Sequence, residues 1–348
     1  MKSFFECNLF EDETFVAHDK FTITQNELIM SSIVNKTNVS FKKKLVEYEC
    51  VWTKQDDWSI RPTILIPIKD NLDLLTYTIS NLKEHKIDTH CNIIVIDDRS
   101  SENIKDTVIN NGLSYLRVDN EKGFNFSMLN NIPAKICYDL GIETIILWNS
   151  DLWCVKEEWF LELLKRHNED NSILSGTKLV YPPEEMSLRD EKDTKNIKDN
   201  FMHMSDGQWR ETIQFGGDAW ITTANRSPIS FSPLHARRFS DIDNPISNSN
   251  KPITFMTGAL HVWDLESFIS FGGLNPSLSK NFQDVDICLK ILENNKAPMY
   301  YGKDLFFYHD ESATMNNLNN EVKNDDQMIS DHYLFGKIWN NKIASLIF

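Results

Sequence analysis

The chain has 348 residues, of which 41% are hydrophobic and 11% aromatic, enough to bury a sizeable core as one large or two smaller domains. No apolar run approaches the ~20 residues that span a bilayer, and acidic residues interrupt the N-terminal segment where a signal peptide requires an apolar region. The formal net charge of −15 argues against a broad nucleic-acid-binding surface, which needs an excess of Lys and Arg on one face.

The cysteines show neither the CxxC spacing of a zinc site nor the density of a disulfide framework. This scatter is typical of reduced, buried thiols in a cytosolic protein. We therefore expect a cytoplasmic protein, either free or peripheral to a membrane. The cysteines are Cys7, Cys50, Cys91, Cys137, Cys154 and Cys288.

The first 60 residues are weakly periodic, and we interpret residues 1–60 as an N-terminal extension of short strands and a helix. A sharper pattern follows. Residues 63–68 (TILIPI) form a short apolar run, typical of a strand buried on both faces. Apolar residues at spacings of three and four across residues 72–82 then predict one face of a helix, capped by Asp70 or Asn71.

Strand and helix patterns alternate beyond this helix. Further strands are predicted at residues 92–100, 114–120 and 144–150. Residues 126–140 are helical in composition, and Pro133 fits if the helix begins near Asn131 and the proline occupies its first turn. The alternation predicts an α/β fold with a mostly parallel central sheet flanked by helices.

Aspartates follow the ends of these predicted strands, at Asp70, Asp97, Asp98 and Asp151. Because parallel sheets bind ligands at the carboxyl ends of their strands, we expect these side chains to converge on one edge. The first strand is not followed by a glycine-rich turn, which excludes a dinucleotide-binding Rossmann turn and a P-loop. A nucleotide bound here would need a divalent cation between its phosphates and the aspartates, and Mg²⁺ or Mn²⁺ suits such oxygen ligands.

The later part of the chain is less regular. We interpret residues 184–252 as a loop-rich insertion, in which residues 211–223 hold one or two strands and residues 224–252 form a long loop. A second ordered block follows at residues 253–315. Residues 316–348 are interpreted as a C-terminal helical tail.

The order and spacing of several segments resemble family 2 inverting glycosyltransferases of the GT-A fold, especially the bacterial rhamnosyltransferase-like branch. The matching segments extend from about Arg61 to Thr314. The resemblance implies a nucleotide-sugar-binding half at residues 61–183 and an acceptor and catalytic-base half at residues 253–315. The segments are TILIPIKDNLDLL, IIVIDDRSSEN, NEKGFNFSMLNNIPAK, ILWNSDLW, KLVYPP with TIQFGGDAW, FMTGALHVW, SFGGLNPSL, NFQDVDICLKI and FFYHDES.

The resemblance implies a nucleotide-sugar site around the ends of the first two strands. Asp98 is expected to contact the base, and Asp97 either contacts the base and ribose or only orders the turn. The alternatives for the remaining residues are a loop lysine for Lys122, a helix cap for Asn131, and core packing for Trp148. The further residues implied as contacts are Pro67, Ile68, Lys69, Asp70, Lys122, Asn131, Trp148 and Asn149.

The resemblance also implies a Mn²⁺ or Mg²⁺ ion held by Asp151 and His309, although a histidine that ends an apolar strand can instead be structural. Asn149 stands where the first aspartate of the family's Asp-x-Asp motif belongs, which leaves less negative charge around the metal. Asp284 is implied as the general base. Gln283 replaces the glutamate that usually precedes it.

The implied reaction is transfer of a sugar, with inversion, from a UDP- or dTDP-linked donor to a hydroxyl of a glycan, a lipid-linked sugar or another acceptor. The same enzyme class could act on a modified nucleic-acid base, which the acidic balance disfavours. A non-catalytic nucleotide-sugar-binding or scaffold protein is the alternative from another class, and it stays open because Asn149 and Gln283 depart from the family pattern. A sugar-phosphate nucleotidyltransferase is disfavoured because its glycine-rich loop is absent.

Overall fold

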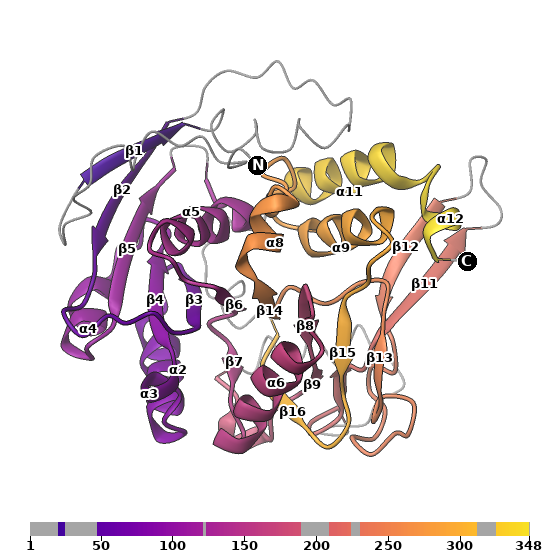
Figure 1. The fold of residues 1–348 in the computed structure, drawn as a ribbon, viewed down its shortest axis with the longest axis horizontal. Coiled ribbons are helices and arrows are strands. Elements are labelled where there is room, and N and C mark those ends of the chain that lie inside the picture. The colour runs from indigo at the N-terminus through magenta and orange to yellow at the C-terminus, as the bar shows by residue number, and fades with distance from the viewer. Residues whose placement is uncertain are drawn as a thin grey trace.

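The computed structural model describes residues 20–24, 47–120, 123–188, 209–223, 230–311 and 325–347. It is a mixed α/β structure built on a ten-stranded sheet (Figure 1). In sheet order the strands are β1 (Lys20–Thr24), β2 (Glu47–Thr53), β5 (Ser114–Asp119), β4 (Asn92–Asp97), β3 (Thr63–Ile68), β6 (Thr144–Trp148), β14 (Leu260–Asp264), β8 (Leu174–Gly176), β15 (Met299–Tyr301) and β13 (Asn250–Pro252).

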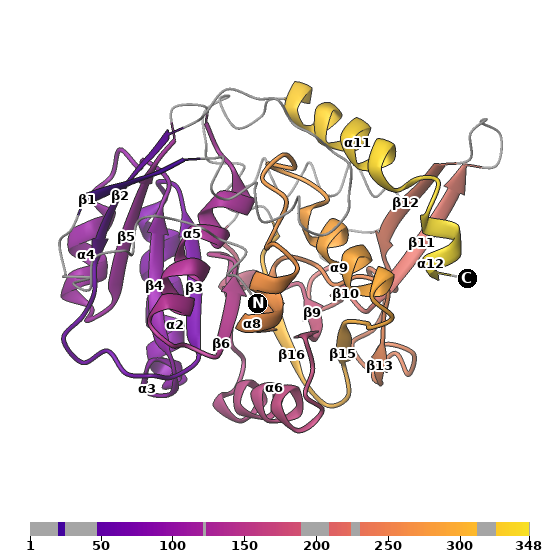
Figure 2. The same cartoon turned by 45° about the horizontal axis from the view of Figure 1, so that its top comes forward.

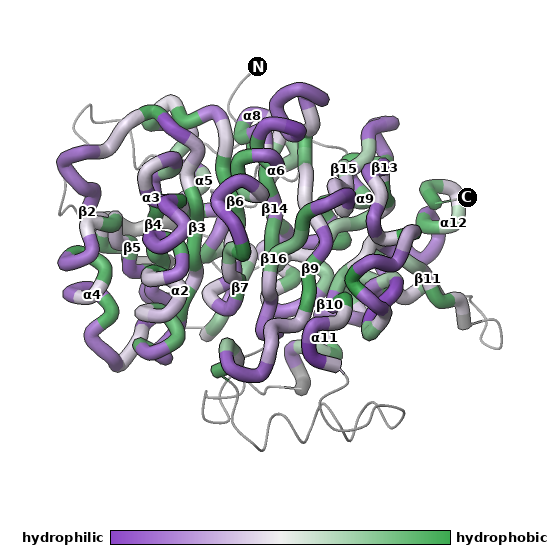
Figure 3. Tube along the Cα trace, turned by 90° about the horizontal axis from the view of Figure 1, so that it is seen from below, coloured by the Kyte–Doolittle hydropathy of each residue, from purple (hydrophilic) through white to green (hydrophobic). Residues whose placement is uncertain are grey.

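The strands β5, β4, β3 and β6 are parallel to one another, as the continuous apolar runs predicted. Every residue of β4 is buried, and most residues of its neighbours β3 and β5 are buried as well; Figure 3 shows hydrophobic residues along β3. The flanking strands β2 and β14 run antiparallel to their neighbours β5 and β6. The carboxyl ends of β3, β4 and β6 therefore meet at one edge of the sheet.

Helices flank this sheet, again as predicted. Asn71 caps the first long helix: it adopts a left-handed conformation (φ 59°), and its side chain accepts a hydrogen bond from the Leu74 backbone N–H at 3.2 Å. The helices of this half are α2 (Leu72–Glu84), α3 (Ile87–His90), α4 (Ile104–Asn110), α5 (Phe126–Asp139) and α6 (Glu157–Glu169).

The predicted start of α5 near Asn131 is wrong. The helix begins at Phe126, because the Asn125 side chain accepts a hydrogen bond from the Met128 N–H at 3.0 Å and caps it there. Pro133 consequently lies inside the helix rather than in its first turn. An interior proline costs about 3 kcal/mol, and the almost complete burial of α5 between Ser127 and Cys137 offsets that cost.

A second sheet of four strands lies beside the main one, in the order β10 (Ile213–Phe215), β9 (Lys178–Val180), β16 (Phe306–His309) and β7 (Leu152–Trp153). A separate hairpin pairs β11 (Asp218–Thr223) with β12 (Ser230–His235). The strands predicted within residues 211–223 are confirmed, but the long loop predicted at residues 224–252 is wrong over β12 and over β13. Pro233 obscured β12, and a proline is tolerated there because the ladder is only two strands wide.

The C-terminal helices pack on the second half of the molecule, where α11 lies beside α9 in both Figure 1 and Figure 2. The Trp339 indole N–H donates to the buried carboxylate of Asp286 at 2.8 Å, and the rings of Phe282 and Phe335 stack at 4.7 Å. These contacts fix α11 against the start of α9. The remaining helices are the 3₁₀ helix η2 (Glu184–Met186), α8 (Leu265–Ser270), α9 (Gln283–Glu293), α11 (Asp325–Trp339) and α12 (Ile343–Ile347).

The cysteines of the described ranges are free and buried, as predicted; Cys7 lies outside those ranges. In the part of the chain that the structure describes, no helix has both the length and the apolar character required to cross a membrane.

Candidate active site

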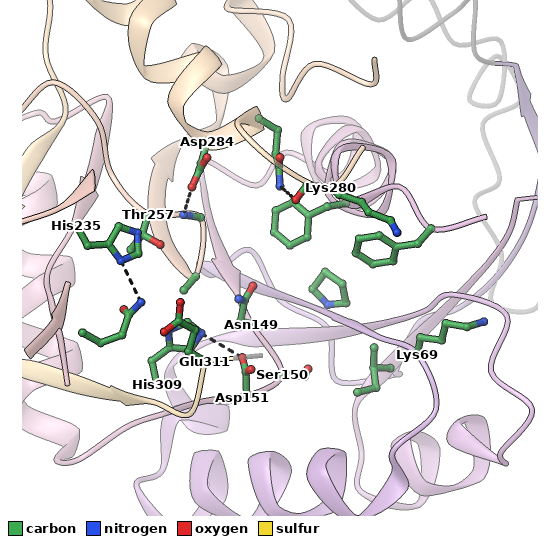
Figure 4. A pocket seen from close by; sticks show the side chains of 18 residues that line it. Lys69, Asn149, Ser150, Asp151, His235, Thr257, Lys280, Asp284, His309 and Glu311 are labelled. Atoms are coloured by element: carbon green, nitrogen blue, oxygen red, sulfur yellow. Dashed lines mark hydrogen bonds and ion pairs between the residues drawn. The ribbon is translucent and has the colours of Figure 1, made fainter. Parts of the chain in front are cut away.

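One pocket lies where the carboxyl ends of β3 and β6 approach the end of β16 and the start of α9. It brings together Pro67, Ile68, Lys69, Asn149, Asp151, Asp284 and His309 from the predicted site (Figure 4). It is also lined by Phe124, Phe126, Ser150, Gln214, His235, Thr257, Gly258, Ala259, Lys280, Gln283 and Glu311.

Strand pairing brings Asp151 and His309 together. In the antiparallel pairing of β7 and β16, His309 lies opposite Leu152, the neighbour of Asp151. The Asp310 N–H also donates to the Asp151 carbonyl at 2.9 Å. The imidazole Nε2 consequently lies 3.3 Å from a carboxylate oxygen of Asp151, and both side chains are buried. Apart from this contact with Asp151, neither ring nitrogen of His309 has a hydrogen-bond partner, so the ring can bind a ligand.

Asp151 and His309 suit a divalent metal that is shared with a substrate. Within the described ranges, no group of three or more His, Cys, Asp or Glu side chains is placed to hold a metal ion. A complete protein cage is therefore absent from those ranges. Mg²⁺ and related ions commonly take only one or two protein ligands and complete their coordination with water and substrate phosphates. Asn149 lines the same pocket with a neutral amide and adds no charge there.

Asp284 lies in the first turn of α9, and Figure 4 shows it across the pocket from Asp151 and His309. Its two carboxylate oxygens accept backbone hydrogen bonds from Gly258 and Val285, each at 2.8 Å. A glycine at 258 permits this approach, because a Cβ there would lie 3.3 Å from that of Asp284. Burial raises the pKa of the Asp284 carboxyl, and the backbone hydrogen bonds only partly oppose it.

Asp98 lies outside the pocket lining but close to Lys69, whose ammonium group donates to the Asp98 carbonyl at 3.3 Å. One carboxylate oxygen of Asp98 accepts from Arg99 at 3.1 Å. The other is buried without any hydrogen-bond partner. Burial raises the pKa of this carboxyl, against the lowering effect of Arg99. An unpartnered buried acceptor of this kind calls for a donor from a ligand.

Asp97 and Asp70 have structural partners instead. The Asp97 carboxylate accepts from the Ser100 N–H at 2.7 Å and the Tyr115 hydroxyl at 2.6 Å, so ordering the turn accounts for its contacts. Asp70 accepts from the N–H and hydroxyl of Ser101 at 2.6 and 2.9 Å and ties two strand-end loops together. Burial would raise the pKa of the Asp70 carboxyl, but the hydrogen bonds from Ser101 outweigh it and lower that pKa. Neither aspartate lines the pocket.

Two other predicted contacts are also engaged elsewhere. The fully buried Asn131 amide accepts from the Leu274 N–H at 2.9 Å and donates to its carbonyl at 2.7 Å. The Trp148 indole N–H donates to the Leu152 carbonyl at 2.9 Å, which matches the core-packing alternative. Lys122 lies outside the described residues.

The sequence analysis missed the polar residues at one end of the pocket, Gln214, His235 and Glu311. The Gln214 side-chain N–H donates to Nδ1 of His235 at 3.1 Å. Burial lowers the pKa of His235 to about 4, so its ring is neutral near pH 7. The Glu311 carboxylate accepts from the Tyr181 hydroxyl at 2.7 Å and forms an ion pair with Arg238. No local signal identifies His235, because its strand lies within the segment predicted as a loop.

No family model matches this chain. It is similar to "Uncharacterized protein y4gI" of Sinorhizobium fredii, with 25% identity over 254 residues that make up 70% of this chain and 24% of that protein. The chain thus spans about a quarter of the length of this curated relative.

Several solved structures overlap with the fold. GalNAc-T7 with UDP, GalNAc and Mn²⁺ has a TM-score of 0.49 at 15% identity, over 73% of this chain and 44% of that chain. Pyrobaculum calidifontis mannosyltransferase PcManGT with GDP-Man and Mn²⁺ has a TM-score of 0.44 at 11% identity, over 76% and 61%. S. aureus TarS with UDP-GlcNAc has a TM-score of 0.45 at 13% identity, over 74% and 61%. All three scores lie below 0.5, so the residues of the pocket carry the assignment of function.

Proposed function

We propose that this protein is a glycosyltransferase that moves a sugar, with inversion, from a UDP- or dTDP-linked donor to an acceptor hydroxyl. One observation carries the proposal. A single pocket at the carboxyl edge of a parallel sheet contains the Asp151–His309 pair on one side and the carboxylate of Asp284 on the other. The Asp151–His309 pair suits a metal-bound diphosphate, and Asp284 supplies a base for an incoming hydroxyl.

Asp284 is the proposed general base. Each of its oxygens accepts one backbone hydrogen bond and keeps a further lone pair for a substrate proton. The carboxylate takes the proton of the acceptor hydroxyl while that oxygen bonds to the anomeric carbon from the face opposite the diphosphate. The bond between the anomeric carbon and the diphosphate oxygen breaks, and the diphosphate leaves with its electron pair. The raised pKa of Asp284 makes it a stronger base than an exposed aspartate.

Asp151 and His309 are the proposed ligands of a Mn²⁺ or Mg²⁺ ion. Such an ion stabilises the charge that develops on a leaving diphosphate. The protein needs this help, because a chain with a net charge of −15 offers a diphosphate a repulsive surface unless local cations intervene. Lys69 is one such cation at the edge of the pocket.

The unpartnered oxygen of Asp98 supports the choice of nucleotide. The imide N–H of a uracil or thymine base can donate a hydrogen bond to this oxygen. Pro67, Ile68 and Lys69 line the adjacent part of the pocket and would pack around the nucleoside.

A thermal-shift panel tests the proposal with UDP-, dTDP-, GDP- and CMP-linked sugars, each with and without Mn²⁺. A ligand present at 100 times its dissociation constant adds about 2.7 kcal/mol to the free energy of unfolding. We expect a metal-dependent shift with one nucleotide class. It should be lost in Asp151→Asn and kept in Asp73→Asn, a matched change at an exposed position of α2. No shift with any donor, in folded protein, would contradict the proposal.

Turnover separates the enzyme from the non-catalytic alternative that Asn149 and Gln283 keep open. Release of the nucleoside diphosphate from the bound donor, with water or an acceptor library, should occur in the wild type and fall sharply in Asp284→Asn. Tight binding of the donor with equal, negligible release in both proteins would support a binding or scaffold protein instead.

A further inference from the structure

Gln214 of β10 and His235 of β12 form a polar end of the pocket. Gln214 is fully buried, and its amide N–H donates to Nδ1 of His235 at 3.1 Å. Because Nδ1 accepts this bond, the proton of the neutral ring resides on Nε2, which makes that atom a hydrogen-bond donor. The ring is held edge-on against Phe215 at 5.1 Å, so its direction is fixed.

The amide oxygen of Gln214 has no hydrogen-bond partner at this end of the pocket. That oxygen is buried and accepts no hydrogen bond. Gln214 and His235 both line the pocket. Buried polar atoms are nearly always satisfied, and leaving one unpaired costs about 1–3 kcal/mol. The amide oxygen of Gln214 is thus a neutral acceptor and Nε2 of His235 a neutral donor, a pair that suits the hydroxyls of a sugar.

The position of these groups identifies the part of the substrate that meets them. In Figure 4, Lys69 and His235 lie toward opposite ends of the pocket, with Asp151 and His309 between them. With the nucleoside at the Lys69 end and the diphosphate at the Asp151–His309 pair, the transferred sugar extends toward His235.

We propose that Gln214 and His235 form the subsite that selects the transferred sugar, and that this sugar is neutral and rich in hydroxyls rather than a uronic acid. The inference rests on the proposed function. Charge supports it: the lysines among the described lining residues, Lys69 and Lys280, lie on the other side of the pocket in Figure 4. The carboxylate of Glu311 lies at this end, and its Arg238 counter-ion is already paired with it. Among the described lining residues, a sugar carboxylate would therefore find no cation at this end to pair with it.

Gln214→Met tests the subsite, because methionine has a similar volume and no hydrogen-bonding amide. Isothermal titration with the nucleoside diphosphate alone and with the corresponding neutral nucleotide-sugar separates the two halves of the donor. We expect the dissociation constant of the nucleoside diphosphate to stay unchanged and that of the nucleotide-sugar to rise about tenfold, the worth of one hydrogen bond of ordinary strength. Gln55→Met, whose amide lies outside this pocket, is the control.

Equal loss of affinity for both ligands in Gln214→Met would overturn the inference, because it would show that Gln214 only supports the pocket. Unchanged affinity for both ligands would overturn it too. Tighter binding of UDP-glucuronic acid than of UDP-glucose to the wild type would overturn the choice of a neutral sugar. Absence of binding by every nucleoside diphosphate to the wild type would refute the proposed function itself, and this inference with it.

Discussion

Asp331 of α11 holds the segment that leads into the proposed catalytic base. It is fully buried, and one carboxylate oxygen accepts from the backbone N–H groups of Lys280 at 2.8 Å and Asn281 at 3.1 Å. The other oxygen accepts from the Gln327 amide at 2.8 Å. Asp284 follows Asn281 by three residues, so we expect Asp331→Ala to weaken both the fold and the reaction.

The expected loss of stability follows from these bonds. A buried N–H left without an acceptor costs about 1–3 kcal/mol, so two would cost about 2–6 kcal/mol. Lys280 and Asn281 are only partly buried, so water can satisfy part of the need, and the expected loss falls to about 2–4 kcal/mol. Asp331→Asn is the matched control. Its oxygen can still face both N–H groups, and the Gln327 amide can turn to accept from the new NH₂, so only charge assistance is lost, about 1 kcal/mol.

Urea unfolding of the wild type and both variants measures these free energies, and donor turnover measures the effect on the reaction. The alanine variant should lower kcat more than the asparagine variant, without changing the dissociation constant of the nucleoside diphosphate. Equal losses of stability in the two variants, or a loss below about 0.5 kcal/mol in Asp331→Ala, would refute this account of the contact.

Other changes test the same half of the molecule. Asp284→Asn should lower kcat by about 10²–10⁴-fold with the affinity for the nucleoside diphosphate unchanged, which turnover and titration check together; a variant that keeps wild-type turnover would exclude Asp284 as the base. Burial raises the pKa of the Asp284 carboxyl, and the ionised base is lost as the pH falls through that pKa. The acid limb of kcat/KM should therefore lie at higher pH than for an exposed aspartate, and disappear in Asp284→Asn. Trp339→Phe removes the indole donor to the buried Asp286 and should cost about 1–3 kcal/mol in urea unfolding, whereas an unchanged midpoint would argue that water replaces it.

Features set by local pattern were predictable from the sequence. The apolar run at residues 63–68 became β3, and the Asn71 cap started α2 as one of two predicted options. The segments that carry Asp151 and His309 could be matched to family motifs, although the contact between them depends on the pairing of β7 with β16. The aspartates at the strand ends were predictable because short apolar runs mark where each strand ends.

Features set by distant pairing were not predictable. The residues near His235 show no strand pattern, because β12 is defined by its antiparallel pairing with β11. Pro133 misled the prediction of α5, because the burial that offsets the cost of an interior proline depends on packing against distant segments. The partners of Asn131 lie at Leu274, far along the chain, so a loop-and-helix motif looked like a ligand contact.

The acids near the strand ends differ in how many of their carboxylate oxygens already have partners within the protein. The Asp97 carboxylate accepts hydrogen bonds from the Ser100 N–H of its turn, from the Tyr115 hydroxyl and from Arg117. The Glu311 carboxylate is bonded to the Tyr181 hydroxyl and paired with Arg238. Asp98, in contrast, keeps an oxygen without a partner. In an acidic protein that binds an acidic donor, such an oxygen is tolerable only if the substrate brings a matching group. The imide N–H proposed for Asp98, the metal-bound diphosphate for Asp151 and the acceptor hydroxyl for Asp284 are those groups.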